Sequence, residues 1–307
     1  MSPELCGTAI IGPVDAALVT NSDYAVEHGL TAALAGTPQR PCLQPTDSCW
    51  ALCPALASGT RGPQNAKVGN VGKPLDLDVT FDMRSDTPKG KDPDSHSPTL
   101  REYHRLLWSK VLPNGARFDL SANKPGAYLY HSSDLGNFLL TSDAAIRTFR
   151  SVRRAASVIE QIPEGEREAF SRQGYTIGGM MLFPGNRIAG MQTINQRRGT
   201  HPKISDRLDL TLECIRRHYL DEHSPLGETL TRYGDFFALF GDFAGYVDYF
   251  LLHDLVTDDF QNVRFLTTFA DFTTPAIPQT LEEYQSYRRQ SLEFVAARNG
   301  RIAAQTY

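Results

Sequence analysis

The residues best suited to bind an anion lie in the stretch NRIAGMQTINQRRGTHPKISDR, residues 186–207. Arginine and lysine suit phosphate groups, and the free N–H groups at a helix N-terminus attract anions. We expect a helix directly after this stretch, so the pattern predicts a phosphate or nucleotide site. The ligand-binding residues of that site would be Asn186, Arg187, Asn195, Arg198 and Lys203. The alternative is an exposed basic loop, in which Asp206 only complements the helix dipole.

Three carboxylates at the start of that helix could add chemistry. Asp206, Asp209 and Glu213 are separated by three and four residues, which places them on one helical face. Carboxylate oxygens hold Mg²⁺ in phosphoryl-transfer sites. We therefore assign a catalytic role to Asp206 and Asp209, either as Mg²⁺ ligands or as a base. The alternative is a salt-bridged outer face, because Arg216 and Arg217 follow within one turn.

A second charged loop, SDTPKGKDPDSHS, spans residues 85–97. Lys89 and Lys91 would extend the ligand site, provided that this loop meets the loop 184–203. The alternative is an ordinary turn, since Asp and Lys beside Pro and Gly are also typical turn residues. His104 follows on an apolar helical stripe, and we interpret it as a core residue.

Periodicity indicates a few strands in the first two thirds of the chain. Apolar and polar residues alternate over 75–83, which predicts a half-buried strand. Ser97 and Pro98 are typical of the N-cap and first residue of a helix. The pair Gly178-Gly179 indicates a place where another backbone approaches closely. Further strands are expected over residues 127–133, 175–183 and 188–194.

Helical periodicity dominates the later part of the chain. The expected helices cover 143–161, 205–221, a segment that begins at Ser224-Pro225, 243–256 and 280–304. The fold class is therefore predicted to be α+β. A small antiparallel sheet, built early and in mid-chain, would be packed by a predominantly helical C-terminal half.

Composition limits the class of protein. The 307 residues carry a formal net charge of -4, which argues against a broadly cationic nucleic-acid coat. No apolar run approaches the roughly 18 residues that span a bilayer. The five cysteines form no paired C-x-x-C motifs, which favours free thiols in a reducing cytoplasm. We expect a cytoplasmic protein with no membrane partner, and a protein partner stays open.

Residues 1–72 differ from the rest of the chain. They are poor in charge and rich in Ala, Gly, Pro, Ser and Thr, and no period persists in them. We expect a poorly ordered extension, of the kind that an upstream assignment of the start codon would add. Residues 73–307 are expected to form a single α+β domain.

Several long blocks of this sequence resemble an uncharacterised family of bacterial proteins. The blocks include SDTPKGKDPDSHSPTLREYHRLLWSK, FPGNRI, QTINQRRG and DLTLECIRR. The resemblance runs from about residue 78 to residue 302 and supports the domain boundary. It implies no activity, substrate or site residues.

The function expected from the residues is binding of a phosphate-bearing ligand, either a nucleotide or a nucleic acid. Mg²⁺-dependent phosphoryl transfer or hydrolysis would be the associated chemistry. The alternative is a non-catalytic protein-interaction or regulatory module, whose charged loops engage a protein partner. Standard signatures such as the P-loop, G-x-G-x-x-G and H-E-x-x-H do not occur.

Overall fold

A three-stranded antiparallel sheet organises the computed structural model, which describes residues 76–123 and 128–305. The central strand β4 (Gly136–Ala144) pairs with β3 (Leu129–Ser133) on one edge and β5 (Met180–Pro184) on the other. All five residues of β5 are buried. A second, two-stranded sheet joins β1 (Lys110–Val111) to β2 (Arg117–Phe118). The predicted extension, residues 1–72, lies outside the described residues.

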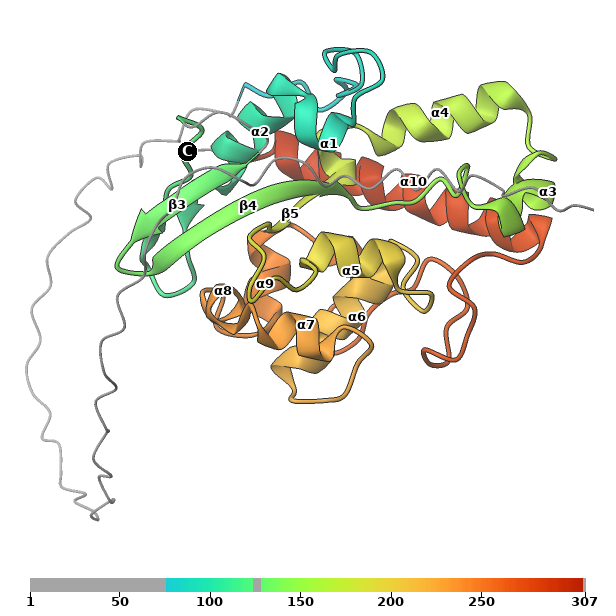
Figure 1. Ribbon diagram of the computed structural model, residues 1–307. Helices are drawn as coiled ribbons and strands as arrows, with labels where there is room; N and C mark the ends of the chain where they lie inside the picture. The colour runs from blue at the N-terminus through green and yellow to red at the C-terminus, as the bar shows by residue number, and fades with distance from the viewer. Residues whose placement is uncertain (1–75, 124–127, 306–307) are drawn as a thin grey trace, which may run out of the picture. The chain divides into compact units, whose positions relative to one another are not determined.

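Helices cover both sides of the main sheet (Figure 1). On one side lie α1 (Pro93–His96), α2 (Pro98–Trp108) and α4 (Glu164–Gly174). On the other side lie α5 (Ile194–Thr200), α6 (Leu208–Tyr219), α7 (Gly227–Thr231), α8 (Gly234–Ala238) and α9 (Phe243–Tyr249). The short elements are η1 (Arg153–Ala155), α3 (Ala156–Ile159), η2 (Ile177–Gly179) and η3 (His253–Leu255). With two small sheets and a mainly helical second half, the fold is α+β, as predicted.

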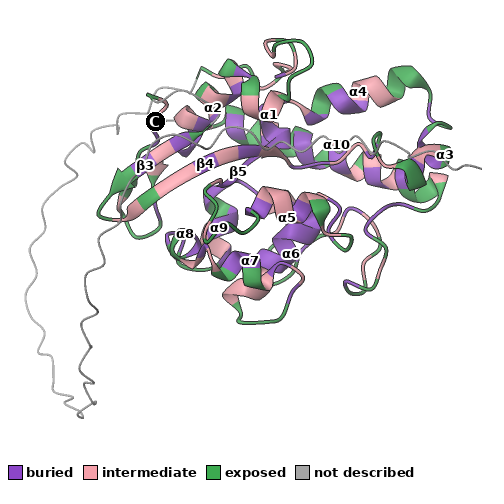
Figure 2. Cartoon of the chain, viewed as in Figure 1, coloured by how far each residue is buried: buried purple, intermediate pink, exposed green. Residues whose placement is uncertain are grey.

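The C-terminal helix α10 (Leu281–Ala303) packs against α3, α4, η2 and η3. Thr280 starts it with a capping box, in which the Thr280 side chain and Glu283 satisfy each other's backbone N–H groups. Its buried residues recur at helical spacing, and Figure 2 shows buried residues at intervals along the helix. They are Tyr284, Tyr287, Ser291, Phe294, Val295, Arg298 and Ile302. No helix in the described ranges is both long and apolar enough to cross a bilayer.

The start of α2 explains part of the charged loop 85–97. Ser97 is the N-cap, as predicted, and its Oγ accepts the N–H of Leu100 at 3.1 Å. Asp86 reinforces this end, because it accepts from Ser97 Oγ at 2.6 Å and from the N–H of Thr99 at 2.9 Å. A carboxylate at the helix N-terminus also complements the helix dipole. Asp86 therefore stabilises α2.

Three expected elements are wrong. Residues 76–83 form turns instead of a strand, since Asp78 accepts the N–H of Thr80 and Asp82 that of Arg84. The expected helix over 143–161 begins inside β4, and Phe149 breaks the segment with φ +57°. The expected strand over 188–194 is irregular and leads into α5, so that β4 is the partner of β5.

The Gly178-Gly179 pair lies where other backbone approaches closely, as predicted. A Cβ on Gly179 would lie 2.0 Å from the carbonyl oxygen of Gly174, and one on Gly178 would lie 2.7 Å from that of Val295. Backbone cannot swing aside as a flexible side chain can. The pair therefore lets α4 and α10 close against the start of β5.

We expect Gly179→Ala to lower the free energy of unfolding by about 1–3 kcal/mol, the usual cost of overpacking. Gly300→Ala in α10 is the matched control, because nothing lies within 4 Å of its new Cβ. The control should raise stability by about 0.5–1 kcal/mol through helix propensity. Urea denaturation of both variants makes the comparison. Equal stability of the two variants would contradict the close approach.

Candidate functional site

A cavity of about 190 Å³ lies where the end of β4, the end of α4 and the turn before α6 meet. Three carboxylates from separate segments line it: Asp94 of α1, Asp143 of β4 and Asp206 of the turn. Arg147 lies at the same cavity. The remaining lining residues are Ala144, Ile146, Thr148, Phe149, Ser151, Ser171, Gly174 and Tyr175. We call this cavity the carboxylate pocket.

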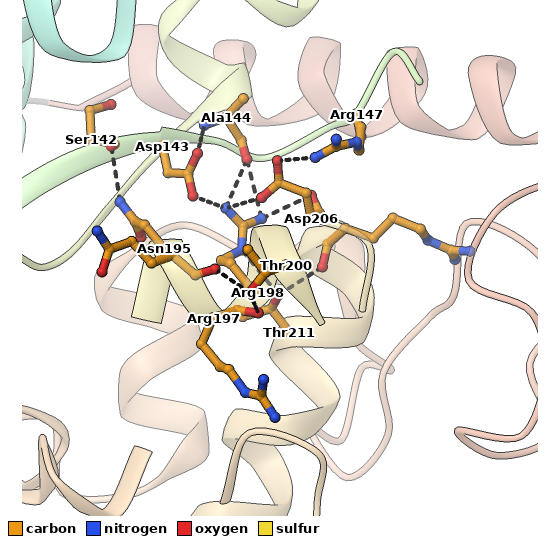
Figure 3. A network of polar contacts seen from close by, with 12 residues as sticks. Ser142, Asp143, Ala144, Arg147, Asn195, Arg197, Arg198, Thr200, Asp206 and Thr211 are labelled. Atoms are coloured by element: carbon orange, nitrogen blue, oxygen red, sulfur yellow. Dashed lines mark hydrogen bonds and ion pairs between the residues drawn. The ribbon is translucent and has the colours of Figure 1, made fainter. Parts of the chain in front are cut away.

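Arg198 lies behind the pocket, next to Asp143 and Asp206, and its side chain is 0% exposed. It donates to Asp143 Oδ2, to the carbonyl oxygens of Ala144 and Asp206, and to Thr211 Oγ1 (Figure 3). A buried guanidinium needs such a set of acceptors, because an unpaired charge would be costly there. Arg198 therefore ties β4 to the turn before α6.

Asp206 reaches the pocket through an unusual turn. Ser205 and Asp206 both have left-handed backbone conformations, with φ +48° and +64°. Residues other than glycine adopt this region at a cost, and such strain is concentrated at functional sites. The turn aims the Asp206 carboxylate at Arg147, whose Nη1 donates to Asp206 Oδ2 at 2.6 Å. Asp206 also lies 3.4 Å from Arg198 Nη1.

Asp94 is the least satisfied of the three carboxylates. Its Oδ1 is buried and has no hydrogen-bond partner among the described residues. Burial, followed by the charges of Asp143, Asp92 and Asp206, raises the pKa of Asp94 well above its usual range. The neighbouring Asp143 is affected in the same direction. Burial raises the pKa of Asp143 to about 7, although the charge of Arg198 opposes the shift.

A buried hydrogen-bond chain holds β4 beside the pocket. Trp108 Nε1 donates to His104 Nδ1 at 2.9 Å, so that Nε2 of His104 carries the proton and donates to Ser142 Oγ at 3.0 Å. Burial lowers the pKa of His104 to about 3, which keeps the ring neutral. Asn195 Nδ2 donates to the carbonyl oxygen of Ser142. Both contacts position the residue that precedes Asp143.

The model of one protein family matches residues 77–302, a span that contains the whole carboxylate pocket. The chain belongs to the family DUF6994. This family is described as one of unknown function. No curated protein and no solved structure matches the chain. The match to the family supports the resemblance seen in the sequence and says nothing about chemistry.

The structure brings together only some of the residues expected to form a site. Asp206 lines the carboxylate pocket, Arg198 lies directly behind it, and Asn195 contacts the neighbouring Ser142. Asp209 lies elsewhere, in a buried ion pair with Arg207. The remaining expected ligand-binding residues are exposed and do not line the pocket: Asn186, Arg187, Lys203, Lys89 and Lys91. Asp94 of the loop 85–97 and Arg198 of the segment 184–203 lie at the same group of carboxylates, because Asp94 lines the pocket and Arg198 is paired with Asp143.

The proposed magnesium ligands are placed differently from one another. Glu213 accepts from Arg216 and Arg217, as the salt-bridged alternative expects, but its side chain is only 5% exposed, so these ion pairs do not form an outer face. Within residues 76–123 and 128–305, no group of three His, Cys, Asp or Glu side chains is arranged to hold a metal ion. In the carboxylate pocket, arginines already neutralise two of the carboxylates. Arg198 lies between Asp143 and Asp206, and Arg147 pairs with Asp206.

Sequence reasoning missed Asp94, Asp143 and Arg147. Asp143 ends an apolar run, FLLTSD, and a carboxylate at the end of a strand is a recognisable signal. Asp94 is one of several acidic residues in its loop, and nothing in the pattern distinguishes it from Asp86 or Asp92. Arg147 lies in the part of the segment 143–161 that the sequence favours as a helix but that is not helical in the structure.

Proposed function

We propose that the protein binds a small molecule in the carboxylate pocket and exchanges a proton with it through Asp94 and Asp143. The buried Oδ1 of Asp94, which has no hydrogen-bond partner within residues 76–123 and 128–305, carries this proposal. A buried carboxylate without a partner is costly, so it persists where function requires it. An acid that titrates near the working pH is an effective general acid or base, and Asp143 is placed in that range.

The charge around the pocket supports a site that holds a proton. Asp94, Asp143 and Asp206 contribute three negative charges, and Arg147 and Arg198 contribute two positive charges. One negative charge is left over when all five groups are ionised. In a buried site this charge requires a proton or a cationic partner.

Binding of a phosphate-bearing ligand, expected from the sequence, stays a prediction. A phosphate would need cations that are free to meet it, whereas Arg147 and Arg198 are each paired with carboxylates. Arg187 and Lys203 are exposed and lie outside the pocket, so they would bind a phosphate group only at a separate surface. The alternative of a non-catalytic interaction or regulatory module also stays open, since a pocket can exchange a proton with a ligand on binding without catalysing a reaction.

Titration of the aspartate carboxyl groups by ¹³C NMR tests the proposal. We expect a transition near pH 7 that disappears in Asp143→Asn and moves to lower pH in Asp206→Asn, because the charge of Asp206 raises the pKa of Asp143. Asp134→Asn is the control, since Asp134 is exposed and does not line the pocket. That control should leave the transition in place. If every aspartate titrates below about pH 5, near the ordinary range, the proposal fails.

A further inference from the structure

We propose further that the ligand of the carboxylate pocket carries a protonated primary amine, which lies against the Asp94 carboxylate. This inference rests on the proposed function, because it names what replaces the proton when the ligand binds. Asp94 Oδ1 is a buried acceptor with no partner among the described residues, and Asp94 lines the cavity. An ammonium group would supply both the missing hydrogen bond and the missing positive charge.

The other groups near Asp94 are unable to supply that charge. The titratable and charged residues around it are Asp92, Asp143, Asp206, Arg147, Arg198 and Tyr175. Asp92, Asp143 and Asp206 are acids, and their negative charges repel a negative charge on Asp94. Arg198 donates to Asp143, and Arg147 donates to Asp206. A bound cation would therefore be attracted by the surplus acid and would meet no free guanidinium.

The pattern of free acceptors favours an ammonium group over a guanidinium. A guanidinium binds best when both oxygens of one carboxylate are available to its planar fork. Asp143 has no free pair, because Oδ2 accepts from Arg198 and Oδ1 from the N–H of Ala144 at 3.0 Å. Asp206 is engaged by Arg147 and Arg198. On Asp94 the buried Oδ1 leaves no accessible pair of oxygens for a planar fork, which suits a compact point charge.

The walls of the pocket indicate a small and partly polar amine. The cavity is lined by four residues that carry hydroxyl groups, Thr148, Ser151, Ser171 and Tyr175, and by the apolar Ile146 and Phe149. A volume of about 190 Å³ far exceeds the space for one water but lies below the roughly 300 Å³ of most drug-sized pockets. A short amino alcohol matches this combination of charge, hydroxyl contacts and size.

Ethanolamine is the probe, and ethylene glycol is its neutral match. We expect ethanolamine to shift the Asp94 carboxyl resonance. As long as pH stays below the pKa of this carboxyl group, the affinity should rise about tenfold for each unit by which pH increases, because binding releases one proton. Ethylene glycol and tetramethylammonium, which lacks N–H groups, should not produce the shift. Asp94→Asn should abolish binding, whereas Asp134→Asn should bind as the unaltered protein does.

The outcomes separate this inference from the proposed function. If the carboxyl groups titrate near neutral pH but ethanolamine produces no shift, the amine ligand is wrong and the proton-exchanging site stands. If guanidinium or Mg²⁺ shifts the Asp94 resonance and ethanolamine does not, the inference is also overturned. If all carboxyl groups titrate in the ordinary acidic range, the proposed function fails first.

Discussion

Replacing Asp209 with alanine is expected to lower the free energy of unfolding by about 3–5 kcal/mol, the cost of leaving a buried charge unpaired. Arg207 and Asp209 form an ion pair in which the side chains are 1% and 0% exposed. Asp209 Oδ2 also accepts the N–H of Leu266, and Arg207 donates to Thr267 Oγ1 and the carbonyl oxygen of Ala276. The pair thus ties the start of α6 to the segment before α10.

Urea denaturation measures this effect. The matched control is Asp119→Ala, because Asp119 pairs with Arg117 at the surface, where the side chains are 65% and 58% exposed. Exposed pairs contribute about 0–1 kcal/mol, so the control should change little. Replacing both Arg207 and Asp209 with apolar residues of similar volume should recover part of the loss. A cost below about 1 kcal/mol for Asp209→Ala would contradict a supporting role for this carboxylate.

Asp94→Asn is expected to stabilise the protein by about 1–3 kcal/mol above pH 7, which is the usual cost of a buried, unsatisfied polar group. The substitution removes the buried charge, and the repulsion from Asp143, Asp92 and Asp206 is lost with it. The pKa of Asp94 is raised in the folded state, so the unfolded chain releases its proton first as pH rises. The gain from the substitution should therefore be near zero around pH 4 and grow toward pH 7.

The comparison must be made as a difference between the two proteins at each pH. His104 is neutral when folded, because burial lowers its pKa to about 3, so protonation of the unfolded chain destabilises the protein as pH falls below about 6.5. This contribution is the same in both proteins and cancels. Thermal or urea unfolding between pH 4 and 8 gives the curve. A variant that is less stable than the unaltered protein at pH 8 would show that the Asp94 carboxylate is satisfied in solution.

Local patterns predicted much of the fold. The N-cap Ser97 and the apolar stripe that follows determine α2, and the 3.6-residue period of the C-terminal segment determines α10. Such signals act within a few turns of chain, so they are readable without a partner. The expected strands and helices failed where two local preferences competed. In 76–83 the Asp side chains bonded to the backbone and formed turns, although the apolar alternation indicated a strand.

The carboxylate pocket depended on tertiary structure. Asp94, Asp143 and Asp206 are separated by 49 and 63 residues of chain, so no spacing rule connects them. Pairing of Ala144 with Met180 extends β4 past Asp143, whereas the sequence favoured a helix there.

Arg198 shows the same division most clearly. The sequence identified it as a cation near the site but assigned it to an outside ligand. The capping box of Thr193 and Gln196 starts α5 at Ile194. Arg198 follows the buried Ile194 by one helical turn, so it lies on the same face and its guanidinium is buried. The sequence by itself determined that Arg198 and the acidic residues were present. Only the packing of α5 against β5 decided that Arg198 would pair with an acid of the protein, Asp143.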